Sequence, residues 1–260
     1  MYEQIEVRRT PGPSLANLFT EIPRTLAEMS SLSLSWLPLR SLPKGDGHTV
    51  MVSPGFLASD QSTRLLRLYL KRMGYDARGW GLGRNTGRFD IMAKRLPDAF
   101  LELAEETGEK ISLIGQSLGG VFSRELARLY PDQVRQVISL GSPIQMEKSE
   151  AVAGLVSRMF EQSTGMSPEE MRDALEYFDE TEAPPVPMTA IYSKGDGVVH
   201  WSACMEKEEG EQTQNIRVCG SHCGMGFNPS IYHIIADRLA QAENAWQKYQ
   251  RPAALEAVYS

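Results

Sequence analysis

A serine flanked by glycines has the surroundings that point most directly to chemistry. Ser117 lies in Gly115-Gln116-Ser117-Leu118-Gly119, between an apolar run typical of a buried strand and a helical pattern. A strand-to-helix turn this sharp would clash with larger residues at the glycine positions, and it holds the serine exposed. A serine hydroxyl attacks a carbonyl carbon when a base removes its proton. Ser117 is therefore predicted to be a nucleophile, and a tight turn without chemistry is the alternative.

The base is expected among four histidines. His48 precedes the first core strand, at the wrong end of the sheet, and His233 lies inside the predicted terminal helix. His222 lies between the last predicted strand and that helix, where a loop can place its ring above the carboxyl edge of the sheet. His200, in another loop after a strand, is the competitor. The chain order nucleophile, acid, base favours His222.

The carboxylate that orients this histidine should lie between Ser117 and His222 in the chain. Asp196 follows directly on a predicted strand, although Asp-Gly is also a common turn signal. The other carboxylates in the interval lie in a stretch that is predicted to cover the sheet rather than to end a strand: Asp173, Asp179 and Glu180. Asp196 is therefore the predicted acid.

Acyl transfer also needs N–H donors for the oxyanion that develops on the carbonyl. The backbone N–H of Leu118, directly after the nucleophile, is the first predicted donor. The second is expected from the loop after the first core strand, because Pro54 has no N–H and Gly55 permits a turn that aims the N–H of Phe56 inward. An ordinary turn is the alternative for Pro54-Gly55.

These residues need a sheet whose strands end close together, and the chain alternates between strand-like and helix-like patterns from residue 48 onward. Strands are predicted over 49–53, 75–80, 110–115, 134–140, 188–192 and 214–219. Helices are predicted over 61–73, 89–107, 118–130 and 231–249. The alternation predicts an α/β fold with a mostly parallel sheet and helices on both faces.

Two stretches depart from this alternation within the expected single domain of residues 1–260. Residues 144–186 are predicted to form a small helical cap, with a helix start at Ser167-Pro168, and two crossover helices are the alternative. Residues 1–44 are predicted to be an N-terminal extension that packs on the core. Within it, residues 14–30 carry apolar residues at helical spacing, interrupted by Pro23. This stripe could also face a lipid, but packing on the core is the commoner outcome and is expected.

Composition excludes several classes of protein. The net charge of -6 comes from 27 basic and 33 acidic residues that are interleaved, which disfavours a nucleic-acid partner. No apolar run reaches about 18 residues, and the first ten lack a signal-peptide core, so no stable membrane insertion and a cytoplasmic location are expected. The three cysteines predict neither a disulfide framework nor a metal site. A Cys204–Cys219 disulfide is possible only if the protein is exported, and the sequence leaves their pairing open.

With these motifs the sequence resembles the α/β-hydrolase-fold lipases and esterases, especially uncharacterised bacterial members. The resemblance spans about residues 40–245 and rests on six segments: 45–48, 54–57, 79–85, 115–120, 196–199 and 221–222. It implies Ser117, Asp196 and His222 as a catalytic triad, with Phe56 and Leu118 as the oxyanion donors. Many of these lipases have His-Gly where this chain has Pro54-Gly55. The chain departs from that pattern at the first position and retains the glycine that permits the turn.

The predicted function is therefore a serine hydrolase that cleaves carboxylic esters, as an esterase or lipase, through an acyl-enzyme and without a cofactor. The apolar stripes suggest a small-molecule ester with an apolar acyl group, and burial of the stripes in the core is the equally favoured alternative. Acyl transfer by the same triad and a non-catalytic binding protein are the alternatives. The sequence leaves open the acyl-chain length, the oligomeric state and the roles of Arg84 and Asn85.

Overall fold

The centre of the structure is a parallel sheet. The computed structural model describes residues 12–88, 90–145, 152–166, 170 and 183–252. Six strands lie in the order β2-β1-β3-β4-β5-β6, and all neighbouring pairs are parallel. Their bounds are β1 (Thr49–Ser53), β2 (Asp76–Gly79), β3 (Ile111–Gln116), β4 (Val134–Leu140), β5 (Met188–Ser193) and β6 (Thr213–Val218). The predicted α/β class with a mostly parallel sheet is confirmed.

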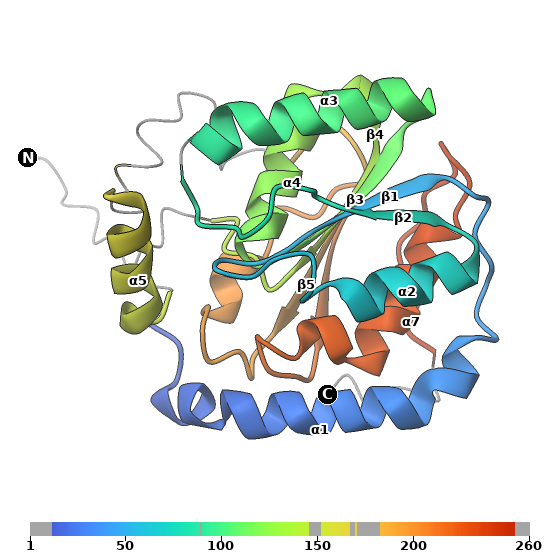
Figure 1. Ribbon diagram of the computed structural model, residues 1–260. Helices are drawn as coiled ribbons and strands as arrows, with labels where there is room; N and C mark the ends of the chain where they lie inside the picture. The colour runs from blue at the N-terminus through green and yellow to red at the C-terminus, as the bar shows by residue number, and fades with distance from the viewer. Residues whose placement is uncertain (1–11, 89, 146–151, 167–169, 171–182, 253–260) are drawn as a thin grey trace, which may run out of the picture.

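Helices cover both faces of this sheet (Figure 1). On one face lie α3 (Leu96–Thr107), which follows a π turn (Ile91–Arg95), and α4 (Leu118–Leu129). On the other lie α2 (Arg64–Met73) and α7 (Pro229–Leu239). Each face has its own cluster of buried apolar side chains. The strands are buried on both sides, which is why they appear in the sequence as nearly continuous apolar runs.

Two further helices lie outside these layers. The long helix α1 (Leu15–Leu39) runs along the outer side of α7, and α5 (Gly154–Thr164) stands beside the carboxyl edge of the sheet (Figure 1). The amino-terminal half of α1 reaches the same edge, because its side chains contact the loops after β5 and β6. None of the described helices is long and apolar enough to cross a membrane.

The terminal helix is shorter than predicted. It ends at Leu239 rather than near residue 249, and Asn244 adopts a left-handed conformation with φ of 66°. The buried guanidinium of Arg238 donates a hydrogen bond to the carbonyl of Gln247 and lies 5.3 Å from the ring centroid of Trp246. The chain therefore turns back over Arg238, a contact that helical periodicity does not reveal.

The N-terminal helix is longer than predicted, since it continues through Pro23 to Leu39. Pro23 lies on the exposed side of the helix, where its missing N–H leaves a carbonyl open to water. The residues after it are held by hydrogen bonds to other parts of the chain, so the proline does not end the helix.

The predicted cap over 144–186 lies only partly within the described residues. Among its described residues, 154–164 form α5, and the centroid of the Phe160 ring lies 5.4 Å from that of Phe56. The predicted helix start at Ser167-Pro168 and the alternative acids Asp173, Asp179 and Glu180 lie outside the described residues. The cap, and an N-terminal extension beginning at residue 1, stay predictions.

Candidate active site

Ser117 lies in a sharp turn between β3 and α4. Its φ of 50° and ψ of -125° form a conformation that residues with side chains rarely adopt. A Cβ atom on Gly115 would lie 2.3 Å from the carbonyl oxygen of Gly119, and one on Gly120 would lie 2.7 Å from the carbonyl oxygen of Gly115. Only glycines allow β3 and α4 to approach this closely, and the hydroxyl of Ser117 is left partly exposed.

His222 and Asp196 form a hydrogen-bonded pair at the carboxyl edge of the sheet. The Nδ1 of His222 lies 2.6 Å from the Oδ2 of Asp196, and both side chains are buried. The other carboxylate oxygen of Asp196 accepts hydrogen bonds from the N–H groups of Val198 and Val199, at 2.8 and 2.7 Å. A proton on Nδ1 directed at Asp196 leaves Nε2 as the nitrogen that can accept a proton.

The surroundings of His222 favour its charged form. Burial by itself would lower the pKa of the imidazole, because it disfavours the cation. The charge of Asp196, its hydrogen bond and the charge of Glu21 outweigh burial and raise the pKa of His222 above its ordinary value. The ring is thus set up to receive a proton and to be stabilised once it carries one.

The structure brings Ser117 and His222 to the same edge through a neighbouring side chain. Gln116 donates a hydrogen bond from Nε2 to the carbonyl oxygen of His222, at 3.2 Å. Among the described residues, no hydrogen bond joins the hydroxyl of Ser117 to the His222 ring. Catalytic hydrogen bonds are often longer before substrate binds and tighten in the reacting complex.

The two predicted oxyanion donors are available. The N–H groups of Phe56 and Leu118 donate to none of the described residues. Leu118 is the first residue of α4, where helix N–H groups have no partner within the helix. A Cβ atom on Gly55 would lie 3.3 Å from the Cβ of Ser117, so the loop that carries Phe56 passes directly beside the predicted nucleophile.

Asn85 holds this loop in place, a role that the sequence leaves open. Its side-chain Nδ2 donates to the carbonyl of Pro54 at 2.9 Å. Its backbone N–H donates to the carbonyl of Ala58, and its carbonyl accepts from the N–H of Leu57, at 2.8 and 2.6 Å. Asn85 is fully buried, whereas its neighbour Arg84 is exposed. The glycine-rich segment around Asn85 was the signal in the sequence that this residue lies in a structured loop. The segment does not indicate that Asn85 bonds to Pro54.

Glu21 contacts both loops of the candidate site, although no motif in the sequence identifies it. Its buried carboxylate on α1 accepts a hydrogen bond from the N–H of Gly197, in the Asp196 loop, at 2.9 Å. It also accepts from the N–H groups of His222 and Cys223, at 3.1 and 3.0 Å. One carboxylate therefore joins the loop of the predicted acid to the loop of the predicted base.

The neighbouring polar residues of α1 contact the same two loops. Glu28 accepts hydrogen bonds from the N–H and the hydroxyl of Ser221, both at 2.7 Å. Arg24 donates from Nη1 to the carbonyl of Gly195 at 2.6 Å. Positions 21, 24 and 28 share one side of the helix, so a polar row opposite the apolar stripe was the signal in the sequence.

This contact corrects the expectation that the apolar stripe of α1 packs on the core. Leu15, Phe19 and Ile22 are 69%, 82% and 75% exposed. The amino-terminal half of α1 packs against the loops after β5 and β6 through its polar row instead. The carboxylates of Glu21 and Glu28 accept hydrogen bonds from the backbone N–H groups of these loops.

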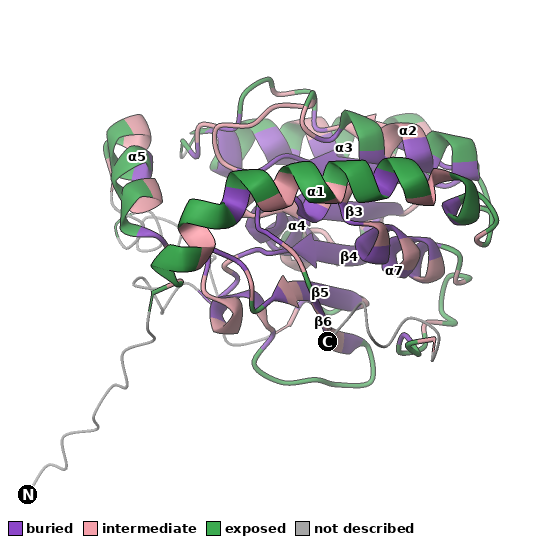
Figure 2. Ribbon diagram, turned by 90° about the horizontal axis from the view of Figure 1, so that it is seen from below, coloured by how far each residue is buried: buried purple, intermediate pink, exposed green. Residues whose placement is uncertain are grey.

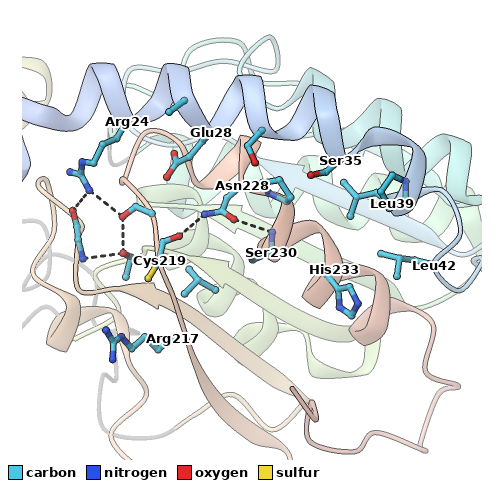
Figure 3. A pocket seen from close by; sticks show the side chains of 18 of the residues that line it. Arg24, Glu28, Ser35, Leu39, Leu42, Arg217, Cys219, Asn228, Ser230 and His233 are labelled. Carbon is cyan, nitrogen blue, oxygen red and sulfur yellow. Dashed lines mark hydrogen bonds between the residues drawn. The ribbon is translucent and has the colours of Figure 1, made fainter. Parts of the chain in front are cut away.

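A cavity of about 920 Å³ lies behind the two loops, on one flank of α1 (Figure 3). Arg24 and Glu28 line it from α1, and Asn228 lines it from the start of α7. Asn228 donates to the carbonyl of Cys219 at 2.7 Å and accepts from the N–H of Ser230, which fastens the β6 loop to α7. The predicted triad residues do not line this cavity. It borders the supports of the loops rather than the reacting atoms.

The other histidines lie elsewhere. His48, at the amino end of β1, contacts the hydroxyl of Ser112 at 2.8 Å. His200 contacts the hydroxyl of Ser202 at 2.9 Å, and His233 lies within α7. Of the four, the structure pairs His222 with Asp196.

The cysteines are all free thiols, so the conditional Cys204–Cys219 disulfide is not formed. Cys204 is buried, whereas Cys219 and Cys223 are exposed. Within the described ranges, no group of three His, Cys, Asp or Glu residues is placed to hold a metal ion.

Comparison with known proteins identifies the fold. No protein-family model matches the chain. A stretch of 150 residues, 53% of the chain, is 29% identical to the carboxylesterase of Bacillus subtilis (strain 168) and spans 60% of the length of that protein.

Similar solved structures include Aspergillus fumigatus lipase B, with a TM-score of 0.58 and 16% identity over 79% of this chain and 56% of that one. Paleococcus ferrophilus monoacylglycerol lipase has a TM-score of 0.52 and 15% identity over 76% and 95%. Naproxen esterase of Bacillus subtilis has a TM-score of 0.50 and 12% identity over 84% and 98%. The chain therefore has the α/β-hydrolase fold, as the resemblance implied.

Proposed function

We propose that the chain is a serine hydrolase that cleaves carboxylic esters, with Ser117, His222 and Asp196 as its triad. The observation that carries this proposal is the meeting, at one edge of the sheet, of the strained Ser117 turn with the His222–Asp196 pair. Similarity to a carboxylesterase supports an ester substrate over other carbonyl compounds.

The reaction begins with attack of the Ser117 Oγ on the ester carbonyl carbon while the Nε2 of His222 takes the hydroxyl proton. The negative charge that develops on the carbonyl oxygen is stabilised by the N–H groups of Phe56 and Leu118. Asp196 stabilises the imidazolium. His222 then protonates the departing alcohol, and an acyl-enzyme remains on Ser117.

Water completes the reaction. His222 takes a proton from water as it attacks the acyl carbon, and then returns a proton to the Oγ of Ser117 as the carboxylic acid leaves. Every step is an acyl or proton transfer among these residues, the ester and water, so it requires no metal ion or cofactor.

The substrate is proposed to carry an apolar acyl group. The rings of Phe56 and Phe160, 5.4 Å apart, lie beside the loop that supplies the second oxyanion donor. An acyl chain attached to Ser117 would meet apolar surface here. Hydrolysis should therefore be faster for esters of longer acyl groups than for acetate.

The test is a series of p-nitrophenyl esters of increasing acyl length, hydrolysed by the wild type and by Ser117→Ala. The substitution should lower kcat by about 10⁴-fold or more, whereas Ser62→Ala, which removes a hydroxyl that donates to the carbonyl of Ser59, should not. A fluorophosphonate should label Ser117, as read by peptide mass spectrometry. Full activity in Ser117→Ala would exclude the proposed nucleophile.

A further inference from the structure

The outward side of α1 carries an apolar stripe with nothing packed over it among the described residues. Its members are spaced four and three residues apart, so they share one side of the helix. They are Leu15, Phe19, Ile22, Leu26 and Met29, with exposed fractions from 39% to 82%. In Figure 2, most of the α1 ribbon is coloured as exposed. A contiguous apolar surface of this kind marks an interaction site.

The helix cannot rotate to bury the stripe without losing its inward contacts. Glu21 and Glu28 accept hydrogen bonds from loop N–H groups, and Leu32 and Leu39 are buried further along the helix. The stripe is therefore held outward by contacts on the opposite side of the same helix.

Arg72 of the basic helix α2 borders the stripe, and the other cations of that helix lie farther around it. The helix α2 has the sequence RLLRLYLKRM, which holds four basic residues and no acidic one, in a chain of net charge -6. A groove of about 610 Å³ between the two helices is lined by Leu26 and Met29 of the stripe and by Leu65 and Arg72 of α2. The apolar stripe therefore meets a cation, Arg72, at this groove, whereas Arg64, Arg67 and Lys71 line a separate depression of α2.

We propose that this surface, the α1 stripe with the basic side of α2, docks on an anionic lipid–water interface. A helix lying in such an interface buries its apolar side near the headgroups, while neighbouring basic residues attract the lipid phosphates. The two chemistries on this surface match those two requirements.

A second copy of the chain is a poorer match. Pairing two of these surfaces through the stripe would bring two α2 helices, each with four cations, close together. Like charges brought together repel, whereas an anionic lipid surface attracts them.

The position of the surface links it to the candidate active site. A Cβ atom on Gly197 would lie 2.4 Å from the backbone of Asn17, so the amino-terminal turns of α1 lie directly beside the Asp196 loop. Docking would hold the carboxyl edge of the sheet close to the lipid. This consequence, delivery of an ester from the lipid phase, rests on the proposed function, but docking itself does not.

The experiment is co-sedimentation of the full chain with phosphatidylcholine vesicles that contain or lack phosphatidylglycerol. The wild type should bind the vesicles with phosphatidylglycerol, and added salt should weaken that binding. The double variant Phe19→Ser/Ile22→Ser should bind these vesicles at least about tenfold more weakly. It removes the two most exposed apolar side chains of the stripe, which would otherwise contact the lipid acyl chains. Lys71→Glu/Arg72→Glu, which reverses the cation at the groove and its exposed neighbour, should abolish the preference for the anionic vesicles.

The matched control is Leu101→Ser/Leu129→Ser, which removes two exposed leucines from α3 and α4 on the other face of the sheet and should bind like the wild type. Absence of vesicle binding, or equal binding to both vesicle types, would overturn the inference. A concentration-dependent dimer that only the stripe variant disrupts would overturn it in favour of a second copy. Hydrolysis of soluble p-nitrophenyl acetate separates the two proposals. An inactive chain that binds vesicles contradicts the ester-hydrolase proposal alone, and an active chain that does not bind contradicts docking alone.

Discussion

In the amino-terminal half of α1, the inward and outward sides reverse the usual arrangement of a surface helix. The inward side carries Glu21, Arg24 and Glu28, which bind the loops after β5 and β6. The outward side carries apolar residues such as Phe19, exposed to solvent. A buried backbone N–H without an acceptor costs about 1–3 kcal/mol, comparable to the gain from burying one apolar side chain. The side of this helix that faces inward is therefore determined by the backbone N–H groups of the neighbouring loops, which require hydrogen-bond acceptors.

The largest effect is expected at the pair that the inward side supports. Asp196→Asn should lower kcat by about 10⁴-fold, because an amide keeps the shape but favours the wrong tautomer of His222 and cannot stabilise its cation. Steady-state hydrolysis of a soluble ester measures this. A loss smaller than about tenfold would mean that another carboxylate orients the histidine.

A smaller effect is expected from Glu21→Gln. Replacing an ionised acceptor of three N–H groups should lower kcat/KM by about 10–100-fold, as expected for about 1.5–3 kcal/mol of lost charged hydrogen bonding. The charge of Glu21 raises the pKa of His222, so the acid limb of kcat/KM should also move to lower pH.

Glu28→Gln is the matched control for this prediction. It removes a carboxylate from the same side of α1, but one that binds Ser221 and does not act on the pKa of His222. It should therefore leave the acid limb in place. If both variants shift the acid limb equally, Glu21 has no specific effect on the pKa of His222.

The pH dependence of the wild type should separate activity from stability at His222. Activity needs the neutral ring, so kcat/KM should fall as the pH drops through the raised pKa of His222. The contribution of His222 to the stability of the fold has the opposite pH dependence. A raised pKa in the folded state stabilises the fold below the ordinary value of 6.5, and this contribution is lost as the pH rises through the folded pKa.

Urea unfolding of the wild type and of His222→Gln should accordingly differ more in free energy at about pH 5 than at about pH 8. A difference that grows with pH would contradict the raised pKa.

The smallest effect is expected on the outward side of α1. Phe19→Ser should change the free energy of unfolding by no more than about 0.5 kcal/mol, since the side chain is 82% exposed. Leu32→Ala, at a buried position of the same helix, should cost about 2–5 kcal/mol. Equal losses in thermal or urea unfolding would show that the stripe is packed rather than exposed.

The sheet was predictable because its strands are buried on both sides. The strands over residues 49–53 and 134–140 are observed with their predicted bounds, and the other four differ by one residue at one or both ends. The helix ends were less predictable, because they depend on side chains that meet across the chain. The end of α7, for example, depends on Arg238 and Trp246.

The sequence by itself determined the sharp turn at Ser117 and the places of Asp196 and His222 at strand ends, since glycine spacing and strand patterns are local properties of the chain. It also determined that α1 would have two unlike sides. Only the tertiary structure decided which side faces inward, and that Glu21 and Asn85 hold the loops of the candidate active site. The physical reason is that helical periodicity specifies the pattern around a helix axis but not its rotation. That rotation is set by hydrogen-bond partners that lie far away in the chain, 201 residues apart for Glu21 and His222.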